Sequence, residues 1–404
     1  MDDILHAERV PADDLPAYAR AVNRHFHEGE EPDDVAPYLD VFATDYRAWW
    51  VRHRGRVAAN LGVIETHVSL PGGTRLPVAA ITAVGVAQTM RRRGLLTQLM
   101  DASLTEAREQ GEPVAALFAS ESAIYGRYGF GVAADHRSYN VERARIRFQD
   151  PVDVRLVEET TPEAALAAWP AIQQRLGDER GGCVDNNAGM WQLNLAVDPP
   201  NWRDGATARR LVEVPGRGYA IYRVKGDEAG LLPAGEVRVA EVFATDPEAY
   251  AALWQHLLDI DLTARITTWI RPVDDVLPHL VTDSLALHTA AGPPMYVRIL
   301  DLPRVLGQRT YASAGSTTIE VVDPAGPVDG RWRLEVGEET VCEPTSAEPE
   351  VTLPVDALAS VVFGCVPPTA LADARRLTEH RPGAAAQLGR LFAVDRAPWS
   401  PVMF

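Results

Sequence analysis

The fold is decided by residues 76–119, which read LPVAAITAVGVAQTMRRRGLLTQLMDASLTEAREQGEPVAALFA. Residues 76–86 form an apolar run typical of a strand buried on both faces, and residues 113–119 predict a second such strand. Between them, apolar side chains recur at helical spacing, and Gly111 follows as a helix stop. The order strand, turn, helix and parallel strand predicts a βαβ unit. The apolar face of the helix comprises Leu95, Leu96, Leu99, Met100, Leu104 and Ala107.

The turn that opens this helix carries three arginines and a glycine, Arg91-Arg92-Arg93-Gly94. A glycine turn entering a helix leaves backbone N–H groups free at the positive end of the helix dipole, which suits a diphosphate. Neighbouring guanidinium groups add charge and forked donors for a further phosphate. For these four residues alone, a solvated basic turn is the alternative. The buried strands on either side favour a bound phosphate compound.

Charge and composition exclude several classes of protein. The chain has 404 residues, and 39 Lys and Arg against 56 Asp and Glu give a net charge of −17. A general nucleic-acid binder needs a basic surface, so that class is excluded. The single lysine, Lys225, follows no glycine-rich loop, which argues against a Walker-type phosphate site. No apolar run approaches the roughly 20 residues of a membrane span, and we expect a cytoplasmic protein.

The cysteines and histidines give no sign of a metal site. Cys183, Cys342 and Cys365 lie far apart and form no CxxC pair, which argues against a disulfide framework or a zinc site. The one close histidine pair, His25 and His27, is interpreted as surface or helix-end residues. We therefore expect no metal.

The first domain continues on both sides of the βαβ unit. Residues 15–26 predict a helix, and residues 49–69 alternate well enough for a hairpin of strands. The turn Pro71-Gly72-Gly73 is predicted to close that hairpin. Residues 120–128 predict a turn or short helix after the second buried strand.

A second region echoes the first. Strands are predicted at 219–224, 237–244 and 265–270, with a helix at 247–258. Its strand-to-helix turn, Thr245-Asp246-Pro247, is an ordinary helix start with an N-cap and a proline at the first helical position. It has no glycine and no arginine cluster, so we expect this copy to bind no cofactor of its own.

The remaining residues predict a small α+β domain. Strands are expected at 317–322 and 331–336, and helices at 355–363 and 371–379. A chain of this length suits roughly two to three domains. The predicted domains are 1–150, 151–300 and 301–404.

At the basic turn, the sequence resembles the GNAT acetyltransferases, which carry Arg/Gln-x-x-Gly-x-Gly/Ala between a strand and a helix. Arg91 and Gly94 match this pattern, whereas Leu96 stands where Gly or Ala is usual. The RRRGLL turn, SAIYGRYGFG at 122–131 and APWSPVMF at 397–404 resemble segments of the Eis-type (enhanced intracellular survival) acetyltransferases. The resemblance implies an α/β (α+β) architecture: a GNAT domain, a second degenerate GNAT-like domain and a sterol-carrier-protein-like domain.

The same resemblance implies acetyl-CoA as the co-substrate. Backbone N–H groups of Val84, Gly85 and Val86 would hold the thioester carbonyl and the pantetheine arm. Ser120 and Glu121 would line that arm, and the start of the helix would hold the pyrophosphate. The residues implied for the pyrophosphate are Arg92, Arg93, Gly94, Leu95, Leu96 and Thr97.

Two groups would carry the proton transfers. Tyr125 occupies the family's position for the general acid, a phenol of reference pKa about 10 against a thiol of about 8.5. The alternative is a core tyrosine, and Tyr128 is three residues away. The implied base is the α-carboxylate of Phe404, the only charge in the last eight residues. Burial would raise its pKa toward a useful range, and a tail that only packs on the surface is the alternative.

The acceptor is less defined. The resemblance suggests amines of polycationic small molecules of the aminoglycoside kind, and a homo-oligomer, a hexamer. An acidic run follows the first helix and is a candidate lining for such a pocket, with a solvated loop as the alternative. A GNAT enzyme acting on another metabolite or a protein lysine, or a non-enzymatic lipid-binding protein, stays open. The acidic run consists of Glu28, Glu30, Glu31, Asp33 and Asp34.

Overall fold

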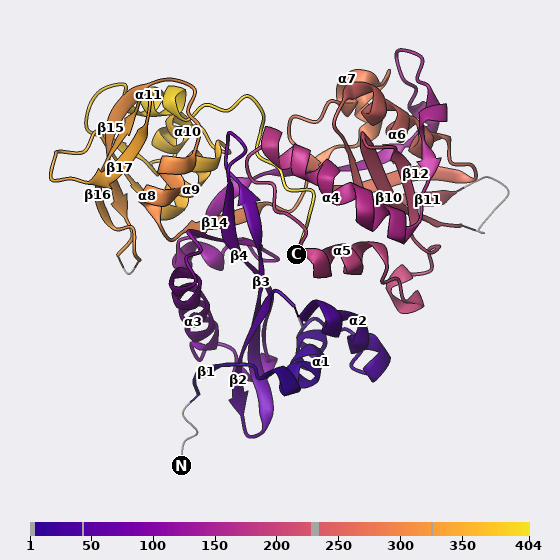
Figure 1. The fold of residues 1–404 in the computed structure, drawn as a ribbon, viewed down its shortest axis with the longest axis horizontal. Coiled ribbons are helices and arrows are strands. Elements are labelled where there is room, and N and C mark those ends of the chain that lie inside the picture. The colour runs from indigo at the N-terminus through magenta and orange to yellow at the C-terminus, as the bar shows by residue number, and fades with distance from the viewer. Residues whose placement is uncertain (1–4, 43, 228–233, 325) are drawn as a thin grey trace.

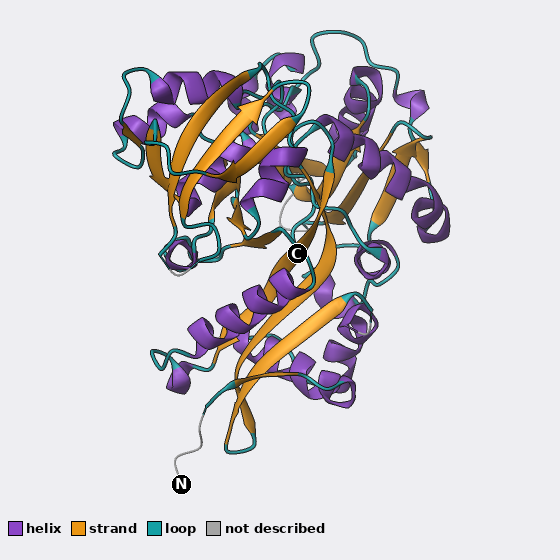
Figure 2. Cartoon of the chain, turned by 60° about the vertical axis from the view of Figure 1, so that its left-hand side comes forward, coloured by secondary structure: helices purple, strands orange, loops and turns teal. Residues whose placement is uncertain are grey.

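The structure is a computed structural model that describes residues 5–42, 44–227, 234–324 and 326–404. It contains three β-sheets, two of seven strands and one of five, each with its own helices (Figure 1). The three parts meet around a centre where Phe404 ends the chain (Figures 1 and 2). No helix in the described ranges is both long and apolar enough to cross a bilayer.

The first sheet has the strand order β1-β2-β3-β4-β5-β14-β6, in which β4 and β5 are parallel. Helix α3 (Leu95–Glu109) connects these two strands, which confirms the predicted βαβ unit. Helix α3 packs on one face of the sheet, and α1 (Leu15–His25) and α2 (Pro32–Phe42) pack on the other (Figure 1). The strands are β1 (Ala7–Arg9), β2 (Tyr46–His53), β3 (Arg56–Ser69), β4 (Arg75–Val86), β5 (Val114–Phe118), β14 (Met295–Ile299) and β6 (Gly131–Ala134).

The hairpin turns differ from the prediction. Strands β2 and β3 are joined at Arg54 and Gly55, whose φ angles are +49° and +75°. Positive φ at both central positions matches the right-handed twist of paired strands, and glycine takes this conformation without strain. The turn Pro71-Gly72-Gly73 instead joins β3 to β4. Alternation alone does not show where within residues 49–69 the chain reverses.

The second sheet has the order β13-β7-β12-β11-β10-β9-β8. Its helices are α4 (Pro162–Glu179), α5 (Ala188–Leu195) and α6 (Pro247–Asp259), and a short α7 (Leu277–Leu280) follows. The predicted strands and the helix that starts at Pro247 are confirmed. The strands are β13 (Ala290–Ala291), β7 (His136–Glu142), β12 (Thr263–Pro272), β11 (Gly235–Ala244), β10 (Gly218–Lys225), β9 (Arg210–Val214) and β8 (Glu158–Glu159).

The first two sheets exchange a strand. Strand β7 follows β6 along the chain but pairs with β12 in the second sheet. In return, β14 enters the first sheet between β5 and β6. Division at residues 150 and 300 therefore assigns both strands to the wrong sheet, because periodicity identifies a strand but not its partner.

The third part is an α+β unit whose sheet runs β17-β16-β15-β18-β19. The helix expected at 371–379 is wrong: α10 begins at Pro368 and ends at Asp373. The chain leaves the helical conformation at Arg375, whose φ is +58°, and β19 then pairs with β18. The elements are β15 (Gly315–Val322), β16 (Gly330–Val336), β17 (Thr340–Pro344), β18 (Val351–Pro354), β19 (Thr378–Glu379), α8 (Leu302–Gln308), α9 (Val355–Phe363), α10 (Pro368–Asp373) and α11 (Ala384–Leu391).

Candidate active site

The parallel strands β4 and β5 separate from each other within the first sheet. Their pairing ends at Ile81 and Leu117, although β4 continues to Val86. A cavity of about 520 Å³ opens at this point, and both strand ends line it. Beyond Ile81, the edge of β4 that pairs with β5 is open, and the backbone of residues 82–86 has no strand partner there in the described chain. Free donors and acceptors of an extended strand are therefore available beside a cavity.

A β-bulge changes the course of β4 near its end. Ala83 has a φ of +49°, and the β3–β4 register shifts between Asn60 and Gly62. Asn60 is fully buried, and its amide donates to the Ala83 carbonyl at 2.5 Å. Its other amide atom contacts Nδ1 of His25, the last residue of α1. Sequence reasoning missed Asn60, although one amide within an apolar strand was a usable signal.

Gly85 is required by close packing at this strand. A Cβ atom there would lie 2.6 Å from the His25 Cβ. His25 is half-buried at the end of its helix, and burial lowers its pKa. The end of α1 therefore packs against β4 through the imidazole of His25, and the lowered pKa favours the neutral form of that ring.

The start of α3 presents free backbone donors. Its N-cap, Gly94, has a φ of +74° and gives no side-chain cap. By contrast, Asp246 caps α6 in the second part by accepting from the Ala249 N–H at 3.0 Å. Leu95 is buried beneath the turn and Leu96 is partly buried, whereas Thr97 is exposed. The three arginines of the turn, Arg91, Arg92 and Arg93, are also exposed.

Tyr125 and Tyr128 have different surroundings, although both lie on the short 3-10 turn Tyr125–Tyr128. Tyr125 is 8% exposed and lines the cavity, whereas the Tyr128 hydroxyl lies 3.1 Å from the Thr97 hydroxyl, outside the cavity lining. Burial raises the pKa of Tyr125, and Tyr128 and Glu121 add to the effect. The raised pKa keeps the Tyr125 phenol protonated near neutral pH.

Phe404 lies between two cavities. Its ring meets the Phe118 ring edge to face at 5.3 Å in the cavity beside β4. It also lines a second cavity of about 260 Å³ with Glu28, Tyr38 and Phe42. Among the ion pairs of the described residues, none includes the Phe404 carboxylate. That carboxylate is therefore not neutralised by a basic side chain of the described chain.

The predicted donor-site residues fall into two groups. Val84 and Ser120 line the cavity beside β4. Gly85 and Val86 continue the same strand, and Glu121 is exposed just after Ser120. The residues 92–97 of the α3 start lie outside the cavity lining.

Two residues of the acidic run are engaged elsewhere. Only Glu28 of the run lines the smaller cavity. Glu30 accepts from the Arg24 guanidinium at 3.0 Å, and Asp34 accepts from the Asn201 amide at 2.8 Å. Glu31 and Asp33 are exposed. The lining thus contains one acid of the run, and its walls are otherwise apolar or aromatic apart from amide and hydroxyl groups.

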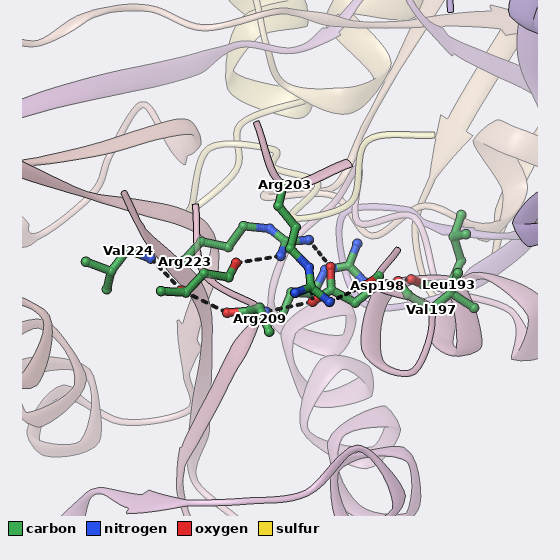
Figure 3. Close-up of polar contacts among 9 residues, drawn as sticks. Leu193, Val197, Asp198, Arg203, Arg209, Arg223 and Val224 are labelled. Carbon is green, nitrogen blue, oxygen red and sulfur yellow. Dashed lines mark hydrogen bonds and ion pairs between the residues drawn. The ribbon is translucent and has the colours of Figure 1, made fainter. Parts of the chain in front are cut away.

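A third cavity, of about 620 Å³, opens beyond Met403 and Trp269 against the second sheet. One wall carries arginines gathered around Asp198 (Figure 3). The Asp198 carboxylate accepts from the Arg223 guanidinium at 2.6 Å and from the Arg209 backbone at 2.9 Å. These bonds tie the segment between α5 and β9 to β10.

Comparisons with known proteins agree with the three parts. Residues 6–133 and 182–299 each match a family described as acetyltransferase (GNAT) domain, and residues 302–401 match a sterol carrier protein domain. An N-acetyltransferase of Streptomyces avermitilis is 37% identical over 349 residues, which cover 84% of this chain and 85% of the relative.

Proteins with the name Eis are also similar. The N-acetyltransferase Eis of Mycobacterium tuberculosis is 32% identical over 345 residues, 82% of each chain. The crystal structure of Eis1 from Mycobacterium abscessus superposes with a TM-score of 0.83 at 29% identity, over 99% of this chain and 100% of that one.

Proposed function

The chain belongs to the Eis-type GNAT N-acetyltransferases, and we propose that it transfers acetyl from acetyl-CoA directly to an amine held beside Phe404. GNAT acetyltransferases use acetyl-CoA as the acetyl donor. One observation carries the proposal. Tyr125 and Phe404, which offer an acid and a carboxylate, line the same cavity where β4 and β5 part.

The donor side of the site fits acetyl-CoA. The open edge of β4 at Val84, Gly85 and Val86 suits the amide groups of a pantetheine arm, with Ser120 and Glu121 alongside. The uncapped start of α3 and its exposed arginines suit the pyrophosphate. The residues proposed there are Arg92, Arg93, Gly94, Leu95, Leu96 and Thr97.

The proposed chemistry divides two proton transfers between two groups. Bound acetyl-CoA supplies a thioester whose carbonyl an amine attacks. The Phe404 carboxylate accepts the proton that the amine loses, and the Tyr125 hydroxyl donates a proton to the departing sulfur. The high pKa of Tyr125 keeps that hydroxyl protonated until the transfer. Backbone N–H groups at the bulged end of β4 would stabilise negative charge on the carbonyl oxygen.

For the acceptor, we propose an amine of a polycationic small molecule of the aminoglycoside kind. Glu28 and the Phe404 carboxylate give the smaller cavity negative charge, and the net charge of −17 attracts cations at long range. The walls of this cavity favour a second class of acceptor, which would undergo the same acetylation of an amine. Tyr38, Phe42 and Met190 form an apolar lining that suits an amine on an aromatic body.

A thiol-release assay tests the proposal. The protein and acetyl-CoA are incubated with an aminoglycoside panel, an arylalkylamine panel and lysine peptides, and free CoA thiol is measured. Release with either small-molecule panel supports the proposal, and the faster panel identifies the acceptor class. Release with lysine peptides alone would assign a protein acetyltransferase. The proposed activity would be refuted if no amine led to thiol release and acetyl-CoA did not change the melting temperature.

We also propose the hexamer that the family resemblance implies. Size-exclusion chromatography with light scattering checks this expectation directly, because a monomer, dimer and hexamer differ severalfold in mass.

A further inference from the structure

The last eight residues, Ala397–Phe404, are held in place between the first two parts of the fold. The Trp399 N–H donates to the Gly181 carbonyl at 3.0 Å, and the Arg180 guanidinium donates to the Ala397 carbonyl at 2.8 Å. Ser400 is fully buried, and its carbonyl lies 3.2 Å from Nε2 of His136. Chain ends are usually poorly ordered unless they are tied down, so this segment is anchored along its length.

Trp399 is the main apolar anchor of the segment. It is 2% exposed and belongs to a buried cluster built by the second part. Its ring centroid lies 6.4 Å from that of Phe243 on β11. The same cluster also contains Trp191, Tyr219 and Ile221.

Trp399 packs near the end of β11, the strand that corresponds to β4 in the first part, where the proposed acetyl-CoA site lies. In the second part, the parallel strands β11 and β12 pair only as far as Arg238 and Thr267, although both continue. Two parallel strands therefore part at the same point of the GNAT topology in both domains. A cavity opens beside the separated strands in both domains. In the second domain, a side chain also crosses the gap further along the two strands.

That side chain is Arg271. Its guanidinium donates to the Val242 carbonyl on the opposite strand at 2.5 Å and to the Asp275 carboxylate at 2.9 Å. Arg271 is 2% exposed, and its Cζ lies 5.1 Å from the centroid of the Trp399 ring. A buried guanidinium against an indole face is a favourable cation–π contact, worth more when desolvated. Arg271 thus bridges the gap at the level of Val242, and Trp399 packs against its guanidinium.

We propose that the second domain has turned its donor cleft into a binding site for the C-terminal segment. The ligand class is an apolar peptide with a tryptophan anchor, here Ala397–Phe404 of the same chain. Trp399 is a positioning residue, because it fixes Phe404 between the two cavities five residues further on. The Ser400 hydroxyl, which donates to the Val402 carbonyl at 2.9 Å, tightens the turn between anchor and end. The catalytic consequence rests on the proposed function, whereas the docking does not.

The docking is tested on full-length protein with carboxypeptidase A, which prefers a C-terminal aromatic residue. Release of free phenylalanine is measured for the wild type, Trp399→Ala and Trp399→Phe. Replacing a buried tryptophan by alanine removes much of the free energy that holds the segment in place. We therefore expect Trp399→Ala to release Phe404 on the order of 100-fold faster than the wild type. Trp399→Phe keeps an aromatic face for Arg271 and should stay within about 10-fold of the wild type.

A matched control separates docking from general loosening. Trp332→Ala removes a partly buried tryptophan of the third part that lies outside the cluster of Trp399. We expect this variant to release Phe404 at the wild-type rate. Equal release from Trp399→Ala and the wild type would overturn the proposal, and so would equal acceleration by Trp332→Ala.

Kinetics then test the positioning role. For Trp399→Ala we expect kcat to fall at least about 10-fold with an unchanged KM for acetyl-CoA, and Trp399→Phe to restore it. Free peptide Ala397–Phe404 added to Trp399→Ala should raise kcat, whereas its C-terminal amide should dock without restoring the rate. Rescue by both peptides would support docking and refute the carboxylate base. Fast release of Phe404 with an undiminished kcat would refute Trp399 as a positioning residue.

Discussion

Tyr125→Phe removes one hydroxyl from the cavity beside β4 and leaves the ring in place. Tyr125 is 8% exposed, and its ring lies 6.2 Å from that of Phe130, edge to face. Within the described ranges, no hydrogen bond is made by its hydroxyl, so the substitution breaks none. We therefore expect the free energy of unfolding to change by less than about 1 kcal/mol.

The effect on catalysis should be much larger than the effect on stability. A positioned general acid contributes typically 10²–10⁴-fold, so kcat should fall by about 100-fold or more, equivalent to about 2.7 kcal/mol. The KM for acetyl-CoA should stay within about twofold, because the hydroxyl acts on the departing sulfur rather than in binding. Steady-state thiol release at saturating amine gives both constants.

Tyr128→Phe is the matched control. It removes a hydroxyl three residues away that contacts Thr97, on a residue outside the cavity lining. We expect its kcat to stay within about threefold of the wild type, because neutral hydrogen bonds near the surface contribute little. Wild-type kcat in Tyr125→Phe, or an equal loss in Tyr128→Phe, would refute the assignment of the acid.

Three further predictions concern the chain end, strand β4 and pH. One glycine added after Phe404 should lower kcat at least about 100-fold while acetyl-CoA still raises the melting temperature; an unchanged rate would exclude the carboxylate as base. Gly85→Ala should cost about 1–3 kcal/mol in urea unfolding, because the new Cβ would meet His25 at 2.6 Å, whereas the exposed Gly126, with open space at its Cβ, should accept Ala. Burial lowers the pKa of His136 to about 4. The stability that comes from burying a neutral His136 is therefore fully present above about pH 6.5 and is lost as the pH falls toward 4. Unfolding at pH 7 and pH 5 should therefore differ by about 2 kcal/mol more in the wild type than in His136→Gln, and equal differences would contradict a neutral buried His136.

Local features of the sequence account for the predictions that succeeded. The strand, basic turn and helix of residues 76–119 lie within one stretch, so periodicity and turn chemistry determine them together. The same holds for α6, whose N-cap Asp246 and following proline mark its start. Where two turns compete, as at Gly55 and Gly72, alternation does not decide between them.

Local sequence patterns are therefore enough to predict the βαβ unit, the second copy with its capped helix, and the family to which the chain belongs. Three features are visible only in the folded chain: the exchange of β7 and β14, the hydrogen bond from Asn60 to the bulge at Ala83, and the packing of Trp399 against Arg271. The two sets of features differ in the sequence separation of the residues that interact. Helices and turns are stabilised by neighbours in the chain, whereas strand partners and buried contacts join residues whose proximity no local pattern encodes. The proposed site depends on such contacts, because its acid, Tyr125, and its carboxylate, at Phe404, lie far apart in the sequence.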